Sequence, residues 1–148
     1  MRFLFALLIL AAPLAAAEPN RWCVATFEVE VTPPLGHPCM GGGILPAKKI
    51  EDPLYARGFA ILGPDKPVVY VAVDWCEIRN DAYGRWCDAI AEAVGTVRER
   101  VMVSALHQHD APIADLTAQK LLDENKSQGK ICDLEFHEKT VLRVAKAA

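Results

Sequence analysis

Two histidines follow directly on an apolar run in the segment VMVSALHQHDAP, residues 101–112. His107 and His109 are two positions apart, so their imidazoles leave the same face if the backbone stays extended. Neutral imidazoles are common ligands of divalent metals, and a carboxylate behind one ring fixes its tautomer. Asp74 or Asp110 could supply that carboxylate. The spacing indicates a metal site in which both histidines are ligands, or in which one binds metal while the other acts as an acid, base or electrostatic stabiliser.

The rest of the sequence excludes three known types of catalytic site. Neither the zinc-protease pattern H-E-x-x-H nor the serine-nucleophile pattern G-x-S-x-G occurs. The aspartate comes one place too early for the H-x-H-x-D-H pattern of the metallo-β-lactamases. An H-x-H pair alone is also compatible with a solvated loop after a strand, so that alternative stays open.

The elements around this segment would place Asp74 and His107 at one edge of a sheet. Residues 68–74 and 101–106 are apolar and rich in valine, and the helical stripe within 79–94 lies between them. A strand, a helix and a second strand form a βαβ unit, whose strands are parallel. Ligands bind beyond the carboxyl ends of such strands.

The remaining pattern completes a mixed sheet. Residues 22–31 alternate like a half-buried edge strand, and 55–62 and 67–75 predict an antiparallel hairpin around Gly-Pro-Asp-Lys. The run 67–75 is apolar on both faces, which is typical of a central strand covered on each side. Residues 36–46 predict a long loop, and residues 114–124 and 134–147 two helices. The predicted fold class is α/β.

The N-terminus has the three regions of a secretory signal peptide. Met1 and Arg2 precede an apolar run that is shorter than the roughly 20 residues needed to span a bilayer, so a membrane anchor is the weaker interpretation. We expect cleavage after Ala17, a secreted or periplasmic protein, and one domain over 18–148. No later segment predicts a membrane span.

The charge pattern gives no reason to expect nucleic acid as a partner. The 148 residues include 16 Lys and Arg against 19 Asp and Glu, a formal net charge of −3, and no basic run occurs.

Five cysteines leave at least one unpaired, and no disulfide pairing follows from their spacing. Cys76 and Cys87 lie in apolar or helical surroundings that favour buried thiols.

For three further residues, a structural or surface role is the more common outcome than a role in a site. His37, in the long loop, could line the same site, but a surface position is the commoner outcome. His137 falls within a predicted helix, where a solvated face is expected. Arg57 favours an ion pair over an anion site.

Several strings together resemble the N-terminal part of the neutral/alkaline ceramidases and related exported bacterial proteins. The most informative is the strand that ends in H-x-H with a proline shortly after, where those enzymes have H-T-H-S-G-P. The matching strings are VEVTPPLG (29–36), DPLYARGFAIL (52–62), VYVAVDW (69–75) and ERVMVSALHQHDAP (99–112).

The resemblance implies a zinc-dependent amide hydrolase. By this resemblance, His107 matches the histidine that binds zinc. His109 matches the neighbouring histidine of the site, which implies a role as a stabiliser or proton shuttle. Asp74 matches an aspartate at the end of the preceding strand. Asp110 stands where the family has a hydroxyl. The family completes its zinc shell far downstream, so we expect an incomplete portion of a larger domain that is inactive alone.

The leading hypothesis is therefore an exported hydrolase that uses Zn²⁺ to cleave a small-molecule or lipid amide, such as N-acylsphingosine in sphingolipid metabolism. Its alternative is a non-catalytic exported α/β module that binds a ligand or partner in loop 36–46. A third is a structural domain, with disulfides, whose histidines lie at the surface. The sequence does not determine the oligomeric state.

Overall fold

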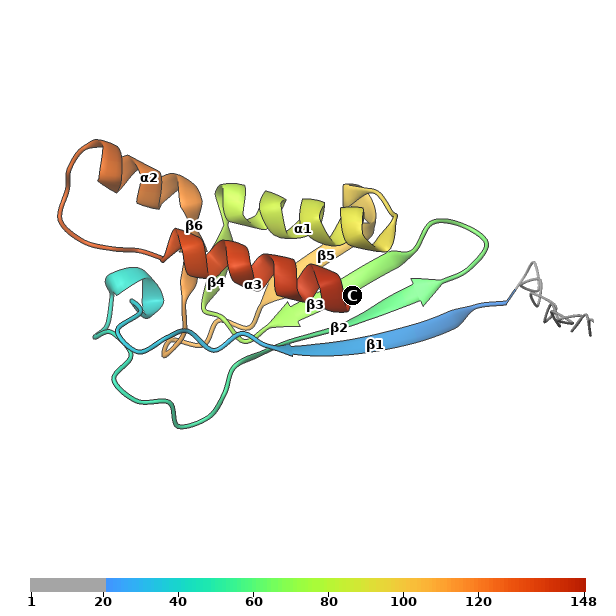
Figure 1. The fold of residues 1–148 in the computed structure, drawn as a ribbon, viewed down its shortest axis with the longest axis horizontal. Helices are drawn as coiled ribbons and strands as arrows, with labels where there is room; N and C mark the ends of the chain where they lie inside the picture. Colours follow the sequence, from blue (N-terminus) through green and yellow to red (C-terminus); the bar gives the residue numbers. More distant parts are fainter. Residues whose placement is uncertain (1–20) are drawn as a thin grey trace, which may run out of the picture.

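The computed structural model describes residues 21–148, and the predicted signal peptide lies outside them. Four strands form a mixed sheet in the order β1-β2-β3-β5 (Figure 1), in which β1 pairs antiparallel with β2, β2 antiparallel with β3, and β3 parallel with β5. The fold is α/β, as the sequence predicts. The strands are β1 (Cys23–Glu30), β2 (Tyr55–Leu62), β3 (Val68–Val73) and β5 (Val101–Ala105).

The predicted βαβ unit is confirmed. Helix α1 (Asn80–Val94) connects β3 to the parallel strand β5, and it ends where Gly95 adopts the left-handed conformation with φ of 74°. Glycine adopts this conformation without strain, so the cap stops the helix at that residue. A short 3₁₀ turn, η2 (Arg98–Arg100), then leads into β5.

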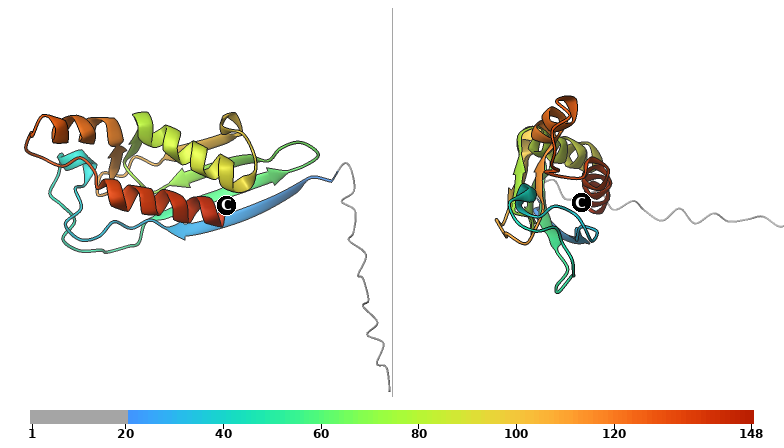
Figure 2. Two further views of the ribbon diagram at one scale, coloured as in Figure 1. Left: turned by 45° about the horizontal axis from the view of Figure 1, so that its top comes forward. Right: turned by 90° about the vertical axis from the view of Figure 1, so that its left-hand side faces the viewer.

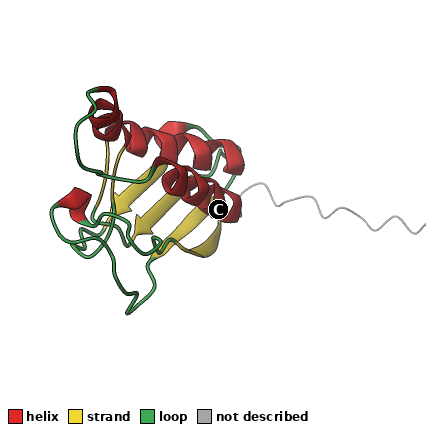
Figure 3. Cartoon of the chain, turned by 60° about the vertical axis from the view of Figure 1, so that its left-hand side comes forward, coloured by secondary structure: helices red, strands yellow, loops and turns green. Residues whose placement is uncertain are grey.

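Helices cover only one face of the sheet. Helices α1 and α3 (Leu134–Ala147) lie side by side on that face, as Figures 2 and 3 show, and no helix among residues 21–148 covers the other. In β3, Val69, Val71 and Val73 are fully buried beneath the helices, whereas Val68 is 41% exposed. The prediction that this run is covered on both faces is therefore wrong, because its apolar outer face has no layer above it.

The aromatic core lies between this sheet and its helices. Trp75 and Trp86 are buried and meet edge to face, with ring centroids 5.6 Å apart. The Trp75 indole donates a hydrogen bond to the carbonyl of Val31 over 3.0 Å, which fixes the chain after β3 against the end of β1. The carboxyl ends of β1 and β3 are thereby tied together below α3.

A second, two-stranded sheet extends the fold beyond the carboxyl ends of β3 and β5. Strand β4 (Glu77–Arg79) pairs in parallel with β6 (Ile113–Asp115), which leads directly into α2 (Leu116–Glu124). The predicted long loop contains the 3₁₀ turn η1 (Met40–Gly42) and contacts β6. The sequence does not predict β4 or β6.

All five cysteines are free thiols, of which Cys23 is exposed and the other four are buried, as expected for Cys76 and Cys87. No helix of residues 21–148 is long and apolar enough to cross a membrane.

Candidate metal centre

The candidate site lies where β3 and β5 end side by side. Val73 and Ala105 are partners at the last register position of the parallel pair. Beyond it the amide of Leu106 donates to the carbonyl of Val73 over 3.0 Å, and that of His107 to the carbonyl of Trp75 over 3.1 Å. The segments that follow β3 and β5 therefore stay hydrogen-bonded for two residues past the strands, which brings Cys76 and His107 together.

His107 has an unusual backbone conformation. Its φ is 63°, in the left-handed region that few residues other than glycine adopt. The extended path assumed from the sequence is therefore wrong: the strand ends and the chain turns at this histidine. The turn directs one ring nitrogen, Nδ1, back toward the end of β3.

Three ligand atoms converge there. Nδ1 of His107 lies 3.9 Å from Sγ of Cys76 and 3.6 Å from Oε1 of Glu77, and the three atoms lie within 4.8 Å of one another. Metal–ligand bonds of about 2.0–2.3 Å in a tetrahedron place ligand atoms about 3.3–3.8 Å apart. The two distances to His107 are close to this range, so the group could hold a metal ion once its side chains adjust around it.

The group is partly shielded from water. The Cys76 residue is only 2% exposed, and the Glu77 side chain 23%, whereas that of His107 is 62% exposed. Burial raises the pKa of the Cys76 thiol, and the nearby Arg79 guanidinium opposes that shift. Arg79 also forms an ion pair with Oε2 of Glu77. The Cys76 thiol is thus protonated at neutral pH unless a cation stabilises its thiolate.

His109 lies beside this group. Its ring centroid is 5.1 Å from that of His107, the two rings are nearly perpendicular, and both residues are exposed. The neighbouring rings agree with the expectation from the H-x-H spacing, although a left-handed turn brings them together. His109 is close enough to act on a group bound at His107, while Cys76 and Glu77 occupy the inner side.

Asp74 makes its hydrogen bonds elsewhere. Its Oδ2 accepts from the amide of Tyr55 over 2.9 Å and from Nη1 of Arg57 over 3.2 Å. Arg57 also donates to Glu28 over 2.6 Å, so its predicted ion-pair role is confirmed. Asp74 thus anchors the start of β2 to the end of β3. Its catalytic role stays a prediction, since these bonds direct the carboxylate toward β2.

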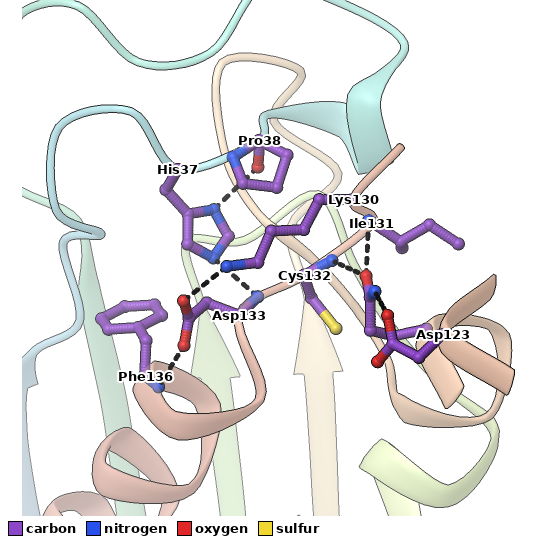
Figure 4. Close-up of polar contacts among 9 residues, drawn as sticks. His37, Pro38, Asp123, Lys130, Ile131, Cys132, Asp133 and Phe136 are labelled. Carbon is purple, nitrogen blue, oxygen red and sulfur yellow. Dashed lines mark hydrogen bonds and ion pairs between the residues drawn. The ribbon is translucent and has the colours of Figure 1, made fainter. Parts of the chain in front are cut away.

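His37 is a buried residue, and its expected surface position is wrong. Figure 4 shows its ring between the loop and the start of α3. Nδ1 lies 2.8 Å from the carbonyl of Pro38, Nε2 accepts from the amide of Asp133 over 3.4 Å, and the ring meets Phe136 edge to face. Burial lowers its pKa, so it is neutral at physiological pH. His37 fastens the loop to α3.

His137 is also buried, at 2% exposure, and the expected solvated face is wrong because α3 packs this face onto the two tryptophans. Its Nε2 is buried without a hydrogen-bond partner among the described residues. Burial lowers its pKa to about 4. The neutral ring is part of the core, away from the metal group.

Sequence reasoning missed Cys76 and Glu77 as ligands. The surroundings of Cys76 predict only a buried thiol, and Glu77 belongs to β4, a strand that the sequence does not predict. A signal was nevertheless present, since both residues come just after a strand that ends at the predicted binding edge.

Comparisons with known proteins give no family for this chain. A scan of protein-family models found no match, and a search of curated proteins found none either. The resemblance to the ceramidases stays a prediction from short strings, and the case for function depends on the geometry of the site.

Proposed function

We propose that the chain is an exported zinc-dependent amide hydrolase of the neutral ceramidase-like type, acting on a small-molecule or lipid amide. The observation that supports it is the convergence of Cys76, Glu77 and His107 at the carboxyl ends of β3 and β5. Two distant segments supply these ligands, and parallel sheets commonly bind ligands at this edge.

The donor atoms favour zinc. One thiolate, one imidazole and one carboxylate match the ligand types of Zn²⁺, whereas Mg²⁺ and Ca²⁺ take oxygen ligands. Three protein ligands leave a coordination position open, as in catalytic zinc sites. A bound zinc ion would supply a Lewis acid that lowers the pKa of water and polarises an amide carbonyl.

The surrounding residues have separate tasks in this proposal. His109 is exposed, with its ring 5.1 Å from that of His107, and can exchange a proton with substrate or solvent. Arg79 neutralises the Glu77 oxygen that does not face His107. Asp74 acts indirectly, because its carboxylate holds the start of β2 to the end of β3.

The ligand set also bears on whether the chain is active alone. The family resemblance implies further zinc ligands far downstream and predicts that this portion is inactive alone. Cys76 and Glu77 offer a different set within the chain itself. We therefore propose that Cys76, Glu77 and His107 bind the zinc ion.

The experiment is metal analysis of the purified full chain together with cobalt substitution. We expect one zinc per chain, and a sulfur-to-cobalt charge-transfer band in the Co²⁺ form. His107→Ala should abolish stoichiometric zinc, and Cys76→Ser should remove the band. Cys23→Ser, at the exposed thiol, is the matched control and should change neither.

Hydrolysis is then assayed with fluorogenic N-acylsphingosine and simpler acyl amides. Activity that chelation removes, zinc restores and His107→Ala lacks would support the hydrolase. Zinc binding without hydrolysis of any amide would favour the non-catalytic binding module. Absence of bound zinc, or a Cys76→Ser protein with unchanged zinc affinity, would refute the proposed site.

A further inference from the structure

The connection between α2 and α3 contains an acceptor pattern for N-glycosylation. Asn125, Lys126 and Ser127 form the only N-x-S/T pattern in the sequence, and its middle residue is not proline. The other two asparagines are followed two positions later by Trp22 and Ala82. In an exported protein this pattern marks a surface segment that can receive an oligosaccharide.

The structure leaves this segment accessible. Every residue from 123 to 130 is exposed, and helix α2 ends at Glu124, directly before Asn125. Lys126 has a φ of 51°, in the left-handed region, so the right-handed helix does not continue past it. Figure 1 shows the connection as a loop beyond the end of α2.

The contacts that hold the connection do not use the acceptor side chains. Oε1 of Gln119 accepts from the amide of Ile131 over 2.7 Å and from that of Cys132 over 3.2 Å, which fastens the far end of the connection to α2. At the near end, the amide of Ser127 donates to the carbonyl of Leu122 over 2.9 Å. An oligosaccharide on this segment would leave these bonds in place.

The Asn125 side chain makes a hydrogen bond that the modification can preserve. Its Nδ2 donates to the carbonyl of Leu121 over 2.8 Å, which satisfies one of the last carbonyls of α2. A side-chain amide nitrogen carries two hydrogens, and N-glycosylation replaces one of them. The remaining N–H can still donate to Leu121, so the end of the helix tolerates the modification.

We propose that Asn125 is an N-glycosylation site whose substrate is an oligosaccharide linked to a polyprenyl diphosphate. Nδ2 of Asn125 attacks C1 of the first sugar, and the N–C1 bond forms as the bond between C1 and the diphosphate oxygen breaks. The diphosphate leaves with the electron pair, and a base of the oligosaccharyltransferase accepts the amide proton. The inference rests on the export that the proposed function includes, because the signal peptide directs the chain out of the cytoplasm.

The test is transfer to the folded full chain by a purified oligosaccharyltransferase, with a polyprenyl-diphosphate oligosaccharide as the probe and intact mass as the readout. We expect one glycan per chain, at a rate within about tenfold of that for a free peptide of residues 121–129, because exposed loops open locally at little cost. Asn125→Gln and Ser127→Ala should abolish transfer, whereas Ser127→Thr keeps the hydroxyl and should preserve it. Gln128→Ala is the matched control, because Gln128 is exposed and adjoins the pattern without belonging to it.

The chain isolated from the cells that make it should carry the glycan on Asn125, identified by mass spectrometry of the peptide that contains it. An unmodified isolated chain, a folded chain that the transferase leaves unmodified, or transfer that survives Asn125→Gln would each overturn the inference. Zinc analysis of the same samples separates the two proposals. A glycosylated chain without zinc refutes only the hydrolase, and an unmodified chain with zinc-dependent hydrolysis refutes only the glycosylation site.

Discussion

Acidification should destabilise the protein through one buried histidine. His137 is 2% exposed and packs against Trp75 and Trp86, and burial lowers its pKa from 6.5 to about 4. A difference of one pKa unit corresponds to about 1.4 kcal/mol, so this shift corresponds to about 3 kcal/mol. That is a large part of the 5–15 kcal/mol by which domains are typically stable.

The direction follows from which state binds the proton. Above pH 6.5 the ring is neutral in both the folded and unfolded chain, and it contributes no pH dependence. Between pH 6.5 and about 4 the unfolded chain takes up a proton that the folded core excludes, so the free energy of unfolding falls as the pH falls. Below about pH 4 both states are protonated and the loss is complete.

The assay is urea unfolding between pH 7.5 and 4.5, on the unmodified chain and on His137→Phe. The variant fills the same aromatic space, and we expect it to lose less stability on acidification, by up to about 3 kcal/mol. His137→Gln separates titration from packing: it should be less stable at every pH, yet show the same shallow pH dependence as His137→Phe. If the free energy of unfolding falls equally with pH in the unmodified chain and both variants, His137 is not the neutral buried group that this reasoning requires.

Three further predictions concern contacts that hold the helices and the sheet. Glu138→Gln removes a partly exposed bidentate ion pair with Arg85 and should lower the free energy of unfolding by about 0.5–1 kcal/mol at pH 7. Arg85 lowers the pKa of Glu138, so the difference between the variant and the unmodified chain should vanish as the pH falls through that lowered pKa. Asp133→Ala removes the cap that accepts from the Phe136 amide over 2.9 Å at the start of α3, and should cost about 1 kcal/mol. Gly58→Ala places a methyl group against the Phe27 ring and should cost about 1–3 kcal/mol. Urea midpoints measure all three, and an unchanged midpoint would contradict the corresponding contact.

The main sheet could be predicted because its elements have strong local patterns. Residues 55–62 and 67–75 are apolar runs around a turn, and the helical stripe of 79–94 ends at Gly95. Such patterns identify the elements and the βαβ connection. They do not tell how many layers cover the sheet, and the valines of β3 have the same composition whether one face is buried or both.

The candidate site was only half predictable for a different reason. Strands β4 and β6 have three residues each, too few for a period of two to be distinguished from chance. Their pairing depends on contacts between residues about 35 positions apart, such as the Cys76 amide donating to the Pro112 carbonyl over 2.8 Å. Glu77 becomes a candidate ligand only once that pairing has positioned it.

The left-handed turn at His107 gives the two histidines different surroundings. Spacing alone treats His107 and His109 as equivalent, since both would leave the same face of an extended chain. The positive φ of His107 instead turns its Nδ1 toward Cys76 and Glu77, while His109 is an exposed neighbour of that ring. A metal ligand needs fixed partners, and a proton-transfer group needs access to substrate and solvent. In the proposed function, the backbone conformation of His107 is therefore the reason to give the first task to His107 and the second to His109.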